Sequence, residues 1–317
     1  MSILTSHPAK PTDHVWFRNL ALVDGEDDTF GVRATFRQTC DEAYEALHSS
    51  LDANFPQRFR EETPEAVSEL LFGMAMVRSG WSLAGQTTRF DFTFTRPDFD
   101  GRVLIEVTTP APPDCSAWTE EALKDGNWTL RSFDQSSRDA AMTRLTGGFY
   151  EKSKVIQKAI AEGHVRLGDY RVIALGGTRL TAEMHWAPSP VGLPPDYAAA
   201  FLPIGQLSVP ITVPRDFSEP PRAGEARHLF SATIPRGHKA NVSREAFASP
   251  LFPHVDAVMF SPVSITGFET PELQSSTLHN PFSNFVGERP MLNLAADYTV
   301  QVTDHELKLT LATSRDA

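Results

Sequence analysis

The sequence predicts an α/β fold in which a central mixed β-sheet is flanked by helices. Three observations lead to this prediction. A helix-like apolar segment spans 63–77, and two apolar strands follow at 89–94 and 102–108. A long helix with an apolar stripe then covers 135–161 and leads into a compact strand at 170–175. This order of elements is typical of a sheet that is covered by helices.

The helix over 63–77 has recognisable ends. Thr63, Pro64 and Glu65 place a capping residue, a proline at the first helical position and an acid in the first turn. Gly80 ends the segment. Its middle is apolar nearly all round, which is typical of a buried helix.

Two further helices are predicted from apolar spacing. The first begins near Thr39 and is ended by Phe55-Pro56. The second is the long helix 135–161, which Gly163 closes. Its stripe is formed by Leu145, Phe149, Ile156 and Ile160, and three lysines, Lys152, Lys154 and Lys158, are expected largely off that stripe.

The chain is divided into four stretches around a single core. An N-terminal extension covers 1–35, with a short strand hidden in 15–23, and the core spans 36–180. Residues 181–250 are rich in proline and poor in periodic runs, so we expect an elaborated loop region there. Residues 251–317 complete the same domain with a strand at about 254–260, a loop at 278–282 and a C-terminal β-hairpin of 298–302 and 307–311.

The composition is that of an ordinary globular protein, with 41% hydrophobic and 22% charged residues. No stretch approaches the roughly 18–20 apolar residues that span a bilayer, and the N-terminus lacks the features of a signal peptide. Cys40 and Cys115 are too few for a disulfide scaffold or a four-cysteine zinc site. We therefore expect a cytoplasmic protein with no membrane partner.

Three carboxylates stand in apolar surroundings. Asp91 and Glu106 each lie inside an apolar strand, where a carboxylate is costly unless something compensates it. On adjacent antiparallel strands the two could face each other, and Glu69 on the packed helix could reach the same place through a water. Mg²⁺ prefers such hard oxygen ligands and takes only one or two protein carboxylates, so Mg²⁺, or Mn²⁺ in its place, is the predicted ion.

Each of these acids also has a simpler interpretation. Glu69 could form a salt bridge with an arginine in the core. Asp91 points away from Phe90 and Phe92 in an alternating strand, and that direction could be solvent. Glu106, inside the run Val-Leu-Ile-Glu-Val, is the strongest single signal for a site.

The stretch from about 60 to 176 resembles the restriction-endonuclease-like, or PD-(D/E)XK, superfamily. The resemblance rests on Glu69 in a helix, on Phe90-Asp91-Phe92 and Ile105-Glu106-Val107 in two strands, and on the lysine-bearing helix and strand that follow. It implies a restriction-endonuclease-like core and a metal-dependent nuclease acting on nucleic acid, with DNA favoured. Asp91, Glu106 and the Val107 carbonyl would bind the metal, with Glu69 assisting through water.

The lysine of this pattern should stand at position 108, which is Thr108. In the superfamily a neighbouring helix can supply it, and Lys154 or Lys158 would be the natural donor; we take Lys154. Without such a lysine the chain would be a catalytically inactive binding or regulatory module, and a hydrolase of other chemistry is a third reading. Oligomeric state is open, and a homodimer is compatible with the sequence.

The charge of the chain weighs against a nucleic-acid enzyme, because a net charge of −11 opposes phosphate binding unless one face is locally positive. A small basic cluster lies at 227–239, with Phe230 and Phe247 nearby. It could contact a phosphate backbone or be an ordinary exposed loop. His254 and Asp256 form a lone pair without zinc-type spacing, and we expect a structural role for them.

Overall fold

The computed structural model describes most of the expected core. The described residues are 10, 13, 17, 32–85, 89–111, 135–177, 179–180, 195–213, 220–225, 227–236, 239–262, 270–303 and 307–312. Cys115 lies outside them, as does most of the strand expected at 15–23. Its described residue, Phe17, is helical and not in a strand, and it is buried against Phe59. Among these residues no helix has both the length and the apolar character needed to cross a bilayer.

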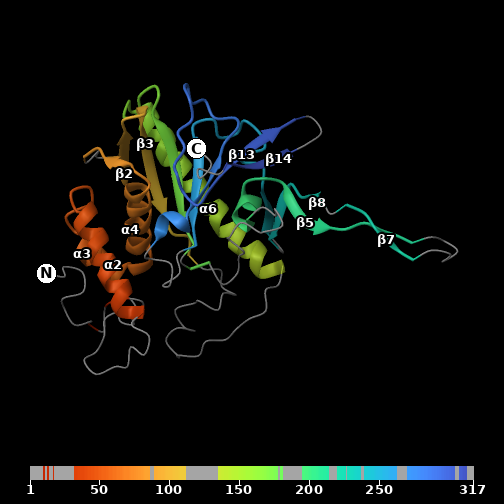
Figure 1. The fold of residues 1–317 in the computed structure, drawn as a ribbon, viewed down its shortest axis with the longest axis horizontal. Coiled ribbons are helices and arrows are strands. Elements are labelled where there is room, and N and C mark those ends of the chain that lie inside the picture. The colour runs from red at the N-terminus through yellow and green to blue at the C-terminus, as the bar shows by residue number, and fades with distance from the viewer. Residues whose placement is uncertain are drawn as a thin grey trace.

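An eight-stranded mixed sheet forms the centre of the molecule (Figure 1). Its strand order is β1-β2-β3-β4-β11-β12-β13-β14. Pairing is antiparallel from β1 to β3, parallel from β3 through β4 to β11, antiparallel to β12, parallel to β13 and antiparallel to β14. The strands are β1 Ser82–Leu83, β2 Phe92–Arg96, β3 Phe99–Thr108, β4 Tyr170–Gly176, β11 Ala257–Ser261, β12 Ser276–His279, β13 Ala296–Val302 and β14 Leu307–Ala312.

Helices cover both faces of this sheet. Helices α2 (Val32–Leu47), α3 (Phe55–Glu61) and α4 (Thr63–Arg78) lie together on one face, and α6 (Gln135–Ala161) lies on the other (Figure 1). The expected α/β architecture with a mixed sheet flanked by helices is thus present. A short 3-10 helix, η1 (Asp196–Ala200), packs beside α6, and another, η3 (Pro271–Leu273), packs against α4.

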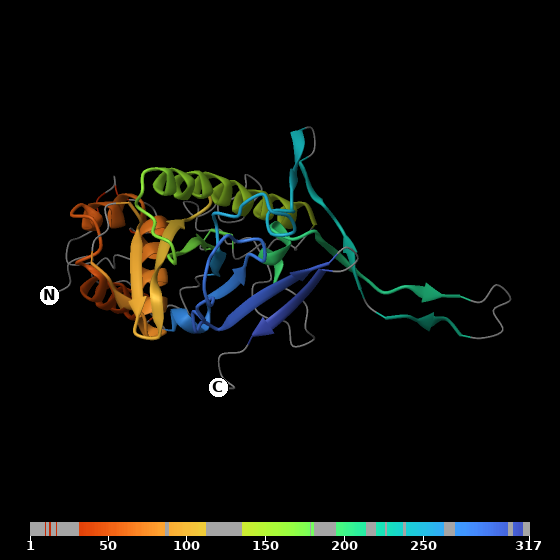
Figure 2. The same cartoon turned by 90° about the horizontal axis from the view of Figure 1, so that it is seen from above.

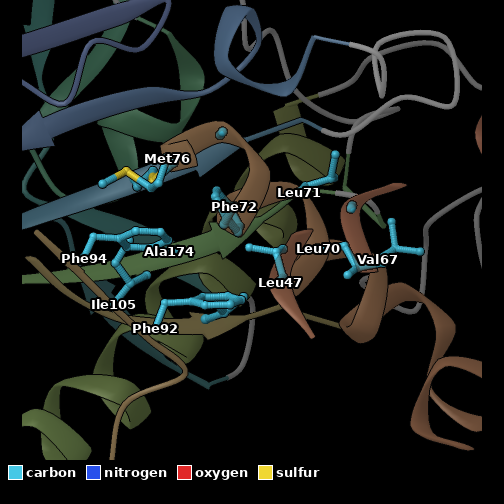
Figure 3. Close-up of a cluster of buried hydrophobic side chains, with 14 of the residues drawn as sticks. Leu47, Val67, Leu70, Leu71, Phe72, Met76, Phe92, Phe94, Ile105 and Ala174 are labelled. Atoms are coloured by element: carbon cyan, nitrogen blue, oxygen red, sulfur yellow. The ribbon is translucent and has the colours of Figure 1, made fainter. Parts of the chain in front are cut away.

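The alternation of side chains along β3 assigns its two faces. Val103, Ile105 and Val107 belong to the core under α4, whereas Leu104 belongs to the core under α6. Figure 3 shows the first of these cores, where side chains of α4 lie over Phe92, Phe94, Ile105 and Ala174 of three adjacent strands. Because successive residues of a strand point to opposite faces, Glu106 is directed towards α6.

The first helix differs from its prediction at both ends. It begins at Val32 rather than near Thr39 and ends at Leu47. Phe55 and Pro56 do not terminate it but open α3, because proline is tolerated in the first turn of a helix, where its missing N–H has no partner to lose. The long helix was predicted with the bounds that α6 has.

The proline-rich stretch differs from the expected loops in its described parts. It contains η1 and the paired strands β5 Ile204–Ser208, β6 Ile211–Thr212, β7 Arg222–Ala223, β8 Arg227–Phe230, β9 Thr233–Arg236 and β10 Lys239–Ser243. Strands β5 and β6 pair with β8 and β7 in a ribbon that extends away from the rest of the molecule (Figure 2). Strands β9 and β10 form a separate hairpin beside α6. Residues such as Phe201 and Phe247 join the core under α6 instead of forming a second core.

Candidate active site

Glu106 is the most deeply buried acid of the predicted set, with 3% of its surface exposed. It lies near the carboxyl end of β3, between the strands β2 and β4. Its side chain faces α6 because its neighbours in the strand face α4. A carboxylate at such a position requires a partner of opposite charge or a proton.

Lys152 of α6 supplies that partner. Its Nζ lies 2.8 Å from Oε2 of Glu106 and 3.5 Å from Oδ2 of Asp91. One ammonium group therefore bridges the two carboxylates that the sequence predicted to face each other. The two oxygens lie within 3.5 Å of the same nitrogen, so the two carboxylates share the ammonium as a common cation.

Asp91 lies one residue before β2 and not inside a strand as expected. Its Oδ2 accepts a hydrogen bond of 2.7 Å from the backbone N–H of Val107. In a strand the N–H and C=O of one residue point to the same side, so the Val107 carbonyl faces the side on which Asp91 lies. The three metal ligands expected from the resemblance are thus neighbours.

Glu69 of α4 contacts Arg58 of α3. The Arg58 guanidinium donates to both carboxylate oxygens, by a close contact to Oε1 and by Nη1 to Oε2 at 3.4 Å, and it also binds Asp52 at 2.5 Å. The arginine partner considered in the simpler interpretation of Glu69 is therefore present. Asp91 is nevertheless close enough to raise the pKa of Glu69, so the acid belongs to the same electrostatic cluster.

The ionisation of the cluster departs from that of free side chains. Burial raises the pKa of Glu106 to about 7, and the charges of Asp91 and Glu69 add to the rise while Lys152 opposes it. Burial likewise raises the pKa of Glu69 to about 7, against the hydrogen bond from Arg58. Burial alone would lower the pKa of Lys152, but the two carboxylates outweigh it and raise that pKa.

Lys154, the expected lysine donor, is exposed, and Lys158 is exposed next to Glu162. Residues 152 and 154 are about 200° apart around a helix, so they project in nearly opposite directions. Lys152 is three residues after the buried Phe149 and four before the buried Ile156, which places it on the apolar stripe and not off it. The spacing of Lys152 from Phe149 and Ile156 is the signal in the sequence that distinguishes it from Lys154.

The donor set fits a hard divalent cation. When all three acids are ionised, the carboxylates of Glu69, Asp91 and Glu106 face two cationic side chains, Arg58 and Lys152, and one negative charge is left unbalanced. No group of three or more His, Cys, Asp and Glu side chains is arranged as a metal cage within the described ranges. Mg²⁺ does not require one, since it is usually held by one or two carboxylates and completes its octahedron with water and substrate oxygens.

A cleft of about 1010 Å³ opens next to the acids. It begins at Thr108, two residues after Glu106, and runs along one face of α6 to the β9–β10 hairpin. Its α6 wall is formed by residues on successive turns, among them Ser136, Ala140, Thr143, Gly147 and Glu151. The acids of the cluster and Lys152 are not themselves among the residues that line the cleft.

Comparison with family models, with curated proteins and with solved structures gave no match to this chain. What the site can do therefore follows from its own geometry and chemistry.

Proposed function

We propose that the chain is a Mg²⁺-dependent phosphodiesterase that hydrolyses nucleic acid, DNA in the first instance, with a restriction-endonuclease-like core. The observation that carries the proposal is the position of the Lys152 ammonium, within 2.8 Å of Glu106 and 3.5 Å of Asp91. A strand acid, a second acid before the neighbouring strand and a lysine converge at one point. The lysine absent at Thr108 is replaced from α6.

The element order supports the same proposal. Strands β2 and β3 form an antiparallel pair, and α6 connects β3 to its parallel neighbour β4. Helix α4, which carries Glu69, packs against β3 and β4. The resemblance implies this succession of a helix with an acid, two strands with acids, a helix with a lysine and a further strand.

Each residue of the cluster has a distinct role in this reaction. Asp91, Glu106 and the Val107 carbonyl would hold the ion, and Glu69 would act through a water. The chemistry that bound Mg²⁺ supplies is Lewis-acid activation of a water and of the phosphate. The Lys152 ammonium is placed to stabilise negative charge that develops on the phosphate oxygens.

The raised pKa of Glu106 links the activity to pH. Metal-binding carboxylates must be ionised, so proton loss from Glu106 accompanies metal binding. With a pKa of about 7, this acid is largely protonated under acidic conditions and ionised above neutrality. We therefore expect cleavage to rise with pH through about 7.

The test is a cleavage assay on plasmid DNA and single-stranded oligonucleotides with Mg²⁺ or Mn²⁺. Wild type is compared with the double variant that carries both Asp91→Ala and Glu106→Ala. It is also compared with two single variants, Lys152→Met and its matched control Lys154→Met. We expect the wild type and Lys154→Met to cleave the substrates, and we expect cleavage to be lost in the double carboxylate variant and in Lys152→Met. Absence of cleavage in the wild type, or cleavage that survives the double carboxylate change, contradicts the proposal.

A binding or regulatory module that has lost cleavage is the second candidate. Thr108, in the place where the pattern has its lysine, favours it. Metal-dependent binding of nucleic acid without cleavage in the same assay would support this alternative over hydrolysis.

A further inference from the structure

A second polar cluster lies in the core, on strands that β4 and β11 separate from β3. It is formed by Thr277 and His279 of β12 and by Asp297 of β13, which are 0%, 2% and 1% exposed. We propose that these three side chains bind one Zn²⁺ ion, which ties the two parallel strands together as a structural metal site. None of them belongs to the carboxylate cluster, so the site stands independently of the proposed function.

The register of the sheet brings the three side chains to one face. Thr277 pairs with Asp297 across the parallel strands, and His279 follows two residues after Thr277. Their neighbours in the two strands belong to the core under α6, namely Leu278, Ala296 and Tyr298. Because side chains alternate between the faces of a strand, Thr277, His279 and Asp297 all point to the opposite face.

Asp297 has a carboxylate that the surrounding side chains leave unpartnered. Neither Oδ1 nor Oδ2 has a hydrogen-bond partner among the described residues, and no Lys or Arg of that part of the chain forms an ion pair with them. The hydroxyl of Thr277, at the facing position, likewise has no partner there. A buried carboxylate in this state is unfavourable unless a proton or a cation compensates it.

The distance between His279 and Asp297 distinguishes a shared ion from a direct hydrogen bond. Nε2 of His279 lies 3.6 Å from Oδ1 of Asp297. A hydrogen bond would require about 2.7–3.2 Å, and a bridging water of tetrahedral geometry would separate the two atoms by about 4.6 Å. Ligand bonds of about 2.0–2.2 Å to a tetrahedral Zn²⁺ place two ligand atoms about 3.3–3.6 Å apart. The observed separation agrees with a shared ion.

Tyr170 orients the imidazole so that Nε2 can serve as a ligand. Its hydroxyl contacts the backbone carbonyl of Asp256 at 3.3 Å and Nδ1 of His279 at 2.5 Å. A carbonyl only accepts, so both contacts are hydrogen bonds only if the hydroxyl donates to Asp256 and accepts from Nδ1–H. Nε2 of the neutral ring then presents its lone pair towards Asp297. Histidines that bind metals are almost always held in this way through the other ring nitrogen.

The donor set favours Zn²⁺ over Mg²⁺. Zn²⁺ is commonly bound by imidazole nitrogen together with carboxylate oxygen, whereas Mg²⁺ prefers oxygen donors. Here one nitrogen is combined with carboxylate and hydroxyl oxygens, and a water would complete the tetrahedron. Because the site is buried, the ion enters as the chain folds, and its binding adds to the free energy of unfolding.

The test measures the zinc content and the melting temperature of the full chain after refolding from urea, either with one equivalent of Zn²⁺ or with EDTA. We expect wild type to retain one zinc per chain after desalting and to melt at a higher temperature than the EDTA-refolded protein. The double variant with Asp91→Ala and Glu106→Ala should retain the same zinc, because it lacks only the carboxylate cluster. Co²⁺ in place of Zn²⁺ should show the visible absorption of a tetrahedral site.

Three variants of the site and one control assign the zinc to its ligands. His279→Gln and Asp297→Asn should each weaken zinc binding at least 100-fold and abolish the difference between the zinc and EDTA melting temperatures. Asp297→Asn keeps the shape of the side chain, so it should fold in EDTA. Tyr170→Phe, which removes only the hydroxyl that orients the ring, should weaken zinc binding about ten-fold. His48→Gln, at an exposed histidine next to α2, should change neither quantity.

Two results would overturn the inference. Wild type that contains no zinc and melts at the same temperature with zinc and with EDTA would show that a proton shared by His279 and Asp297 replaces the ion. Zinc that is retained with unchanged affinity by both His279→Gln and Asp297→Asn would lie elsewhere in the molecule. Neither result bears on cleavage of nucleic acid, which is lost through Lys152 and the acids beside it.

Discussion

Two buried acids lie on the same face of the sheet and are partnered in very different ways. Asp256, fully buried, accepts from the Arg171 backbone N–H at 2.5 Å, from Nε at 2.7 Å and from Nη2 at 2.6 Å, and also from the Ser283 hydroxyl. Within the part of the chain that the structure describes, Glu106 accepts one hydrogen bond, of 2.8 Å, from Lys152. The Asp256–Arg171 pair joins the residue before β11 to β4, whereas the Glu106–Lys152 pair joins β3 to α6. The contacts of Asp256 fill the acceptor sites of its carboxylate, and those of Glu106 do not.

This difference in hydrogen bonding indicates that the Asp256–Arg171 pair stabilises the fold, whereas the Glu106–Lys152 pair is available for chemistry. An ionised carboxylate has about four acceptor sites, and those of Asp256 are filled by a planar guanidinium and its neighbours. Glu106 keeps spare acceptor capacity, has other acids close by and has a pKa raised to about 7 by burial. Perturbed ionisation of an underpartnered buried acid beside a cleft is typical of functional sites. The expectation of a structural role for Asp256 agrees with its contacts.

Removing Arg171 should have the largest effect on stability and tests whether the Asp256–Arg171 pair is structural. Arg171→Met leaves Asp256 buried and without its main donor, and breaking such a pair costs about 3–5 kcal/mol of unfolding free energy. Urea denaturation should detect this loss as a lower midpoint. A change below about 1 kcal/mol would mean that the saturated pair is not structural.

Removing Lys152 should have a large effect on activity instead. If its ammonium stabilises charge on the phosphate, Lys152→Met should lower kcat by about 10²–10³-fold, as the loss of one preorganised electrostatic donor does. Lys154→Met, two residues along the same helix, should keep its rate within about two-fold. If Lys152→Met and Lys154→Met cleave at equal rates, the Glu106–Lys152 pair has no special role in catalysis and its distinction from the Asp256–Arg171 pair is wrong.

The pH dependence of stability gives a further test. The folded pKa of Glu106 lies above its unfolded value, so the folded state binds more protons between about pH 4.5 and 7 and stability falls as pH rises through this window. Glu106→Gln should remove the part of this decline that Glu106 contributes, a gain of up to about 3 kcal/mol at pH 8 at one pKa unit per 1.36 kcal/mol. The part that comes from Glu69, whose pKa is also raised to about 7, should remain. Unfolding curves at pH 4.5 and pH 8 measure it, and a variant that is less stable than wild type at pH 8 contradicts it.

Added Mg²⁺ should produce the smallest effect. At a concentration a few times its Kd the ion should stabilise the folded chain by about 1 kcal/mol, since it binds only the folded state. The rise in melting temperature should be greater at pH 8 than at pH 5.5, because the acids must be ionised. The double variant with Asp91→Asn and Glu106→Gln should lose this rise in melting temperature. A substitution of Asp256 should leave the size of the rise unchanged.

Local patterns in the sequence predicted much of the fold. Apolar periodicity is a short-range property, so α6, α4, β4 and the C-terminal hairpin of β13 and β14 lie close to where they were expected. The same patterns singled out Glu106 and Asp91, because an acid in an apolar run is visible without a structure. The first helix was predicted with other ends, whereas α3 and the strands of the proline-rich stretch were not predicted, since Pro56 opens a helix instead of ending one and short ribbons have little periodicity.

The sequence by itself therefore determined which acids are unusual and which segments carry them. Only the tertiary structure decided which lysine meets them, because the answer depends on how α6 is rotated and how closely it lies over β3. Gly148 permits that close packing against Thr108, and Lys152 is the lysine that then points inward. Contacts between residues distant in the chain are set by packing, which local periodicity does not encode.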